Sequence, residues 1–196
     1  MNLLNLTGAS FLENTSTFER IEMKNGLATI KAVTTHISKK GHSCAKIEFQ
    51  DFSDKENKLA GHVEYLSTGE GNRFYKLAQK LAYIAKYSKN EAARQAFAQV
   101  IYPIQVVKDA AGQELNFKTM DELKQIQDSY GDNVTFIWNE DVDRTRKAII
   151  IANPEAFIQQ YVAVMSQFVG ETLFLELKKD GESGFQRLIS INPPKL

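Results

Sequence analysis

Alternating apolar and polar positions mark the first part of the chain as a run of strands. Residues 27–37 are rich in β-branched side chains, residues 44–52 alternate apolar with polar side chains, and residues 59–67 continue in an extended pattern. The polar, glycine-containing segment 38–42 has the length of a hairpin loop, and residues 51–58 form a turn-prone link. The pattern therefore predicts three successive strands joined as a meander.

The period changes to that of a helix after the glycine-rich turn 69–71. Apolar side chains then recur on one helical face, at Phe74, Leu77, Leu81 and Ile84. Ser88, followed three residues later by Glu91, fits a capping box and predicts a second helix through residue 100. Two consecutive helices are therefore expected after the meander.

Strand and helix signals alternate in the second half of the chain. The predicted elements are a strand at 104–108, a helix from the capping box 119–122 to about residue 131, strands at 133–139 and 147–152, a helix from Asn153-Pro154 to residue 168, and a hairpin with arms 172–179 and 185–191. The connections are short enough for one compact unit. We therefore expect a single α+β domain over residues 1–196.

Charge is balanced over the chain but not along it. The sequence has 24 basic and 24 acidic residues, which argues against binding through bulk positive charge. Residues 71–96 contain six basic side chains and one acidic one, a local charge of +5, whereas residues 109–143 contain nine acidic and two basic ones, a local charge of −7. This polarity either orients the protein on a polyanion or holds one part of the chain against another.

Cysteine usage and hydropathy bear on the compartment. Cys44 is the single cysteine, so no intrachain disulfide is available. The first residues lack the pattern of a signal peptide, and no apolar run reaches the length of a membrane span. We expect a cytoplasmic protein without a membrane partner.

Basic and aromatic side chains form a stripe on the first predicted helix. Arg73, Lys76, Lys80, Tyr83 and Tyr87 recur at intervals of three and four, beside the apolar face. Cations bind phosphates and aromatic rings stack on unpaired bases, so the combination suits a single nucleic-acid strand. A solvated helix flank with tyrosines covering the core edge gives the same pattern.

Further candidates lie in the hairpins. Lys39 and Lys40 occupy a predicted hairpin tip, and Lys46 follows on the next strand. Lysines at exposed hairpin tips also occur simply because they keep a protein soluble. The aromatic residues Trp138, Phe174 and Phe185 lie at alternating positions of predicted strands, where either face serves for packing or for stacking.

Signatures of catalysis or metal binding are weak. His42, Cys44 and His62 do not complete a recognised zinc set, and the acidic loop 140–143 lacks partners at metal-binding spacing. The turn 69–71 opens a helix as phosphate loops do, but neither GxxxxGK[ST] nor the third glycine of GxGxxG is present. The sequence indicates a protein that is not an enzyme and uses no cofactor or metal.

The segments FERIEMKNGLATIKAV, SKKGHSCAKIEFQD and GHVEYLSTGEGNRFYKLAQKLAYI, together with the terminal KKDGESGFQRLISINPP, resemble phage-encoded OB-fold proteins that bind single-stranded DNA. The resemblance covers about the first 85 and the last 25 residues. It implies an OB-like β-barrel of mostly antiparallel strands elaborated by helices, with residues 88–168 as a helix-rich insertion packed on the barrel. The chain departs from that family's pattern at residues 192–196, which read NPPKL where many members carry the acidic tail that recruits replication partners.

We therefore expect non-catalytic binding of single-stranded DNA in phage-type replication or recombination, in the host cytoplasm if the protein is phage-encoded. The residues expected to carry binding are Lys39, Lys40, Lys46, Arg73, Lys76, Lys80 and Arg187 for phosphates and Tyr83, Trp138 and Phe185 for bases. The acidic segment is expected either to contact the basic helix of a neighbouring protomer, giving a homo-oligomer, or to shield the site. The alternative is a structural or interaction protein, such as a virion component or an inhibitor of a host enzyme, acting through its acidic face.

Overall fold

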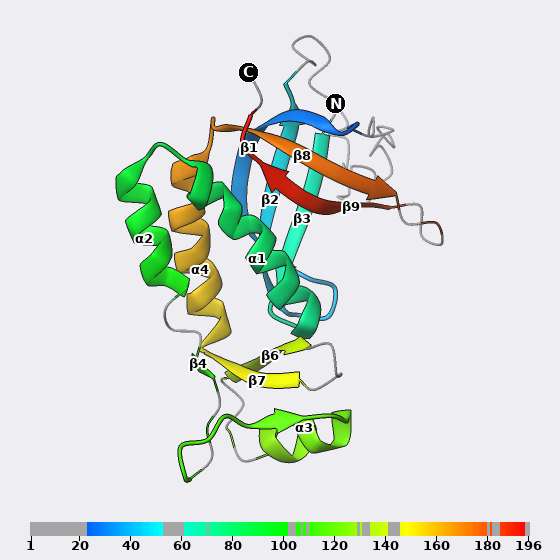
Figure 1. The fold of residues 1–196 in the computed structure, drawn as a ribbon, viewed down its shortest axis with the longest axis vertical. Coiled ribbons are helices and arrows are strands. Elements are labelled where there is room, and N and C mark those ends of the chain that lie inside the picture. Colours follow the sequence, from blue (N-terminus) through cyan, green and yellow to red (C-terminus); the bar gives the residue numbers. More distant parts are fainter. Residues whose placement is uncertain are drawn as a thin grey trace, which may run out of the picture.

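The computed structural model describes residues 23–52, 61–69, 71–101, 105–106, 108, 110–128, 130, 134–140, 146–179, 181 and 185–194. These residues form two antiparallel sheets and four α-helices, with the larger sheet at one end of the long axis and the smaller sheet towards the other (Figure 1). The predicted α+β class is confirmed.

The larger sheet has five strands in the order β3-β2-β1-β8-β9, and every pairing is antiparallel. Its strands are β1 (Gly26–Ile37), β2 (Ser43–Asp51), β3 (Gly61–Ser67), β8 (Thr172–Lys179) and β9 (Gln186–Asn192). Strand β1 pairs with β2 over nearly its whole length and with β8 through residues 26–29, so it joins the meander to the last hairpin. The predicted meander and closing hairpin are confirmed, whereas most of the link 51–58 lies outside the described residues.

The sheet curls so that its two edge strands, β3 and β9, approach each other (Figure 1). No backbone ladder joins these two strands in the part of the chain that the structure describes. The sheet is therefore not closed into a barrel, and the expected barrel is corrected on this point. The physical reason is that the side chains of Glu64 and Lys80 form hydrogen bonds with the backbone N–H and carbonyl of Leu188 at the gap.

Three helices and the inner face of the sheet build the main core. They are α1 (Gly71–Tyr87), α2 (Glu91–Ile101) and α4 (Pro154–Met165), and a 3₁₀ turn, Ser166–Phe168, extends α4. Helix α4 packs on β1 and β2 and buries Phe157, Ile158 and Tyr161. Burial raises the pKa of the Tyr161 phenol. Because α4 lies within the segment 88–168, this segment shares one hydrophobic core with the five-stranded sheet.

The smaller sheet has β7 (Arg146–Ala152) at its centre. Strand β6 (Val134–Glu140) pairs along one edge, while β4 (Gln105–Val106) and β5 (Asn116–Phe117) share the other edge. Ile137, Ile149 and Ile151 belong to the main core, and Phe117 and Phe136 contribute to a second, smaller core on the side of α3 (Met120–Gln127). Strand β5 was not predicted, because two residues are too few to show alternation.

Side-chain caps explain where the later helices begin. The side chain of Thr119 accepts a hydrogen bond from the Glu122 N–H at 3.2 Å, and that of Asn153 accepts one from the Ala156 N–H at 3.2 Å, as predicted. The predicted capping box at Ser88 is wrong. Helix α2 begins at Glu91 and is capped by Asn90, because the buried Ser88 hydroxyl donates instead to the carboxylate of Glu171. Helix α3 ends at Gln127, earlier than predicted.

Candidate functional site

A groove of about 290 Å³ lies between α1 and β9. It is lined by Glu64, Asn72, Arg73, Lys76, Leu77, Lys80, Arg187 and Leu188. Four of these residues are cationic: Arg73, Lys76 and Lys80 from α1, and Arg187 from β9. This cationic groove brings together four of the ten residues predicted for binding, from segments more than 100 positions apart in the sequence.

Helix α1 presents its cations to the groove because its apolar face is fixed against the core. Phe74, Leu81 and Ile84 are almost completely buried, so the neighbouring positions 73, 76 and 80 fall along one edge of the buried face. The helix begins at Gly71, which has a left-handed φ of 47°. A Cβ built on Gly71 would lie 2.2 Å from the Trp138 ring, so the tryptophan of β6 fills the space beside the start of α1.

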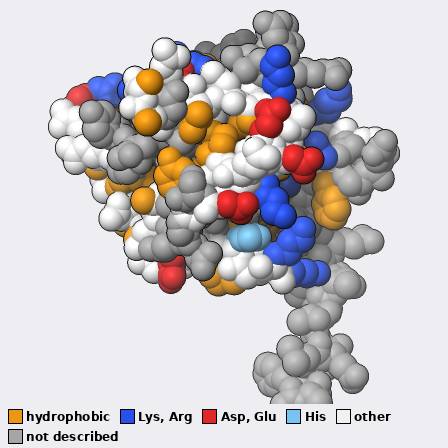
Figure 2. Space-filling model, turned by 90° about the horizontal axis from the view of Figure 1, so that it is seen from below, with side chains coloured by type: hydrophobic (Ala, Val, Ile, Leu, Met, Phe, Trp, Pro, Cys, Tyr) orange, Lys and Arg blue, Asp and Glu red, His pale blue; other side chains and the backbone are white. Residues whose placement is uncertain are grey.

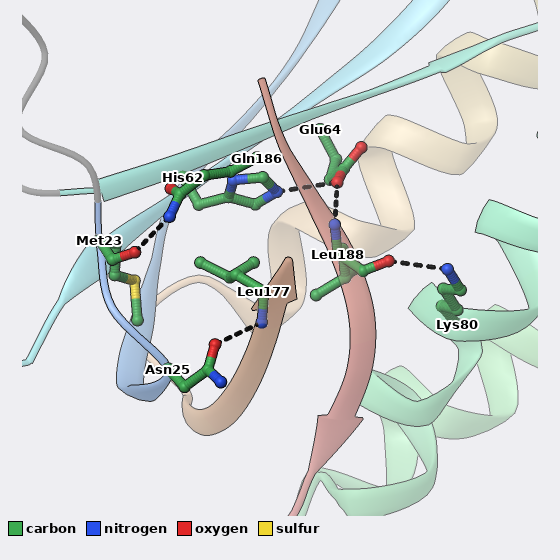
Figure 3. A network of polar contacts seen from close by, with 8 residues as sticks. All are labelled: Met23, Asn25, His62, Glu64, Lys80, Leu177, Gln186 and Leu188. Carbon is green, nitrogen blue, oxygen red and sulfur yellow. Dashed lines mark hydrogen bonds and ion pairs between the residues drawn. The ribbon is translucent and has the colours of Figure 1, made fainter. Parts of the chain in front are cut away.

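The floor of the groove is a polar network at the gap between β3 and β9 (Figure 3). The Leu188 N–H donates to Oε1 of Glu64 at 2.9 Å, and the Leu188 carbonyl accepts from the ammonium of Lys80 at 2.7 Å. The same Glu64 oxygen lies 2.8 Å from Nε2 of His62. These side chains supply partners to edge-strand backbone groups that a barrel would pair in a ladder. Lys80 is therefore a structural residue of the groove as well as one of its cations.

The hairpin of β8 and β9 extends the basic surface beyond the groove. Phe185, which precedes β9, is 75% exposed, the most exposed of the large apolar side chains in the described residues. Lys178 lies directly opposite Arg187 in the register, and Lys179 opposite Gln186. Like charges that face each other across strands destabilise a sheet. Lys178, which the sequence argument did not select, therefore lies beside Arg187 on one face of the hairpin, whereas Lys179 lies on the opposite face.

The β1–β2 hairpin carries the second predicted basic locus. Lys39 and Lys40 are exposed at its tip, as predicted. Lys46 lies on the outer face of β2, where its ammonium is 2.5 Å from the Glu48 carboxylate. Its register partner on β3 is Tyr65, which is exposed and whose ring lies 5.2 Å from that of His36. The exposed pair Tyr65 and His36 was missed by the sequence argument.

The aromatic residues of the predicted site differ in their surroundings. Tyr83 is 41% exposed and its ring stacks on that of Tyr87 at 5.8 Å, with the Lys86 ammonium 5.0 Å from the Tyr83 ring. Trp138 is half-buried and meets Phe117 edge-on at 5.9 Å. Tyr83 and Phe185 are thus exposed side chains, while Trp138 packs within the small core.

Some carboxylates of the acidic segment, residues 109–143, form ion pairs or hydrogen bonds with nearby residues of the chain. Among its described carboxylates, Glu114 lies 2.7 Å from the Lys147 ammonium, and the hydrogen bond from this lysine lowers the pKa of Glu114. Glu122 accepts a hydrogen bond from the Lys118 N–H at 2.7 Å, and this bond lowers the pKa of Glu122. Asp109, Asp132 and the predicted loop residues 141–143 lie outside the described residues.

Figure 2 shows the molecule from below, where Lys and Arg side chains follow one side, with several acidic side chains between them. In the described part of the chain, no three His, Cys, Asp or Glu side chains gather in a way that would hold a metal ion. Nor does any helix there combine the length and the hydropathy needed to cross a bilayer.

No family model and no curated protein matches this sequence, so a functional assignment rests on the geometry of the site.

Proposed function

We propose that the protein binds single-stranded DNA without catalysis, through the cationic groove and the β1–β2 and β8–β9 hairpins of the larger sheet. The observation that carries the proposal is the convergence of Arg73, Lys76, Lys80 and Arg187 on one groove. Although the chain has no net charge, its fold brings these four cations together on one surface. Such a local patch supplies the phosphate-binding term of affinity that overall composition does not.

The binding mode combines charge with stacking. Arg73, Lys76 and Arg187 neutralise phosphates, while the exposed rings of Tyr83 and Phe185 stack on bases. Each stacked base contributes on the order of 1–3 kcal/mol and discriminates little between sequences. Lys39 and Lys40 add phosphate contacts at the other hairpin.

We further propose that the larger sheet is a partly open OB-like barrel, as in the phage-encoded proteins that the sequence resembles. The proposal is supported by the strand order, in which β1 pairs with both β2 and β8 while β3 faces β9. OB-folds are five-stranded, partly open barrels that bind oligonucleotides through the second and third strands and the loops after strands one and four. The corresponding positions here are Lys46 with Tyr65, the tip at Lys39 and Lys40, and the hairpin at Phe185. A role in phage-type replication or recombination follows from the same resemblance.

The test is a titration of a labelled single-stranded oligonucleotide at several salt concentrations. We expect wild-type affinity to fall steeply with salt, and Arg73→Ala and Lys76→Ala each to lower the log-log slope by roughly 0.7, the value for one phosphate contact on a single strand. Lys124→Ala, which removes an exposed cation from α3, is the matched control and should leave the slope unchanged. Absence of salt-dependent binding, together with tight association with another protein, would favour the alternative role as an interaction protein.

A further inference from the structure

The cationic groove has an acidic floor, and phosphate binding does not account for it. Glu64 is only 6% exposed, yet it lines a groove whose other charged side chains are all cations. A carboxylate at this place weakens the attraction of the groove for phosphates. Its bonds to Leu188 and His62 explain its burial but use only part of its capacity to accept hydrogen bonds.

Only one of the two carboxylate oxygens of Glu64 is engaged within the described structure. Oε1 accepts from the Leu188 N–H and lies within hydrogen-bond distance of His62 Nε2. Figure 3 shows the second oxygen pointing away from both of these partners. A carboxylate has about four acceptor positions, and those of Oε2 are not used by the printed partners of Glu64 in the described structure.

The base edge of a nucleotide supplies such donors. Cytosine and adenine each carry an exocyclic amino group, and carboxylates accept from the cytosine amino group in known modes of base recognition. Thymine and uracil present a carbonyl oxygen at the equivalent position, which a carboxylate repels. The volume of about 290 Å³ lies just below the roughly 300–1,000 Å³ typical of small-molecule pockets, and it suits one nucleotide-sized group.

We propose that Glu64 reads a base in the groove and gives the protein a preference for amino-bearing bases over thymine and uracil. In this arrangement Arg73, Lys76 and Arg187 hold the phosphates, and the base enters with its amino group directed at Oε2 of Glu64. The inference rests on the proposed function, because it specifies which bases of the bound single strand occupy the groove.

The test compares oligo-dC with oligo-dU of equal length, since the two bases differ only at ring position 4 and in the proton on N3. In mildly alkaline buffer, where cytosine stays unprotonated, we expect the wild-type protein to bind oligo-dC roughly 10- to 150-fold more tightly, as one hydrogen bond to a charged group would give. Equal binding of the two oligonucleotides would overturn the role of Glu64 and leave single-strand binding intact. If neither oligonucleotide binds, the proposed function fails and this inference fails with it.

Glu64→Gln is the decisive variant because it changes one hydrogen-bonding atom. The Leu188 N–H is a fixed donor, so the glutamine oxygen takes the place of Oε1 and the amide NH₂ faces the groove. We expect the preference to disappear or to reverse towards oligo-dU, whose O4 accepts from the amide. Glu176→Gln, which removes a charge from the exposed side of β8, should retain the preference for oligo-dC. An unchanged preference in a folded Glu64→Gln protein would contradict the inference.

Discussion

Individual side chains were predictable from the sequence where their role follows from local spacing. In any tertiary structure that buries Phe74, Leu77 and Leu81, the cations at positions 73, 76 and 80 lie along one edge of the helix. Glu64 is different, because its role depends on a strand more than 100 residues away. An acid within a strand is normally solvated, and only the unpaired gap between β3 and β9 gives this one a reason to be buried.

Gly71 shows how a single residue sets the start of the helix that carries the groove. Its left-handed φ costs any other residue about 1–2 kcal/mol, and overlap of a Cβ with Trp138 adds about 1–3 kcal/mol. We therefore expect Gly71→Ala to lower the free energy of unfolding, measured in urea, by about 2–5 kcal/mol. Gly112 also has a positive φ but has no atom near its Cβ position, so Gly112→Ala should cost only the backbone term. Equal losses in the two variants would rule out the contact with Trp138 as a source of strain.

Elements were predicted well where a cap or a long alternation defines them. The caps at Thr119 and Asn153 and the strand 172–179 agree with the structure. The start of α2 was misplaced because Ser88 and Asn90 are both good capping residues, and the choice between them depends on the tertiary contact of Ser88 with Glu171. Alternation alone also left open which face of each strand is buried, and so did not separate packing aromatics from exposed ones.

Phe185 and Trp138 provide a test of whether an aromatic side chain of a strand stacks on bases or packs in the core. Phe185→Ala at the β8–β9 hairpin should weaken oligonucleotide binding by about 1–3 kcal/mol and change stability by less than about 0.5 kcal/mol. Trp138→Ala in β6 should destabilise the fold by about 2–3 kcal/mol, less than a fully buried tryptophan, and should hardly change the affinity of the folded protein. Strong quenching of the Trp138 emission by the oligonucleotide would show instead that this ring stacks on bases.

At the scale of the whole molecule, the sequence predicted one α+β unit but not how the edge strands of its larger sheet approach each other. The meander and the last hairpin are each local, whereas their junction along β1 and the gap between β3 and β9 are long-range features. The segment between the hairpins also contributes to the core that they enclose. Phe97 of α2 meets the rings of Tyr161 and Phe168 at 5.9 Å and 6.3 Å, and these residues pack into the same cluster as β1 and β2.

This shared core predicts that the two sheets unfold together. Trp138 reports on the smaller sheet as the single tryptophan of the chain, whereas far-ultraviolet circular dichroism reports on all helices and strands. If Ile137, Ile149 and Ile151 bind the smaller sheet to the main core as the structure indicates, the two signals should follow one urea transition with the same midpoint. Limited proteolysis should likewise release no stable fragment spanning about residues 90–168, since such a fragment would lose the sheet on which α4 packs. An earlier fluorescence transition, or a protease-resistant fragment of that span, would mean that the segment folds independently and that the groove is built on the five-stranded sheet and α1 alone.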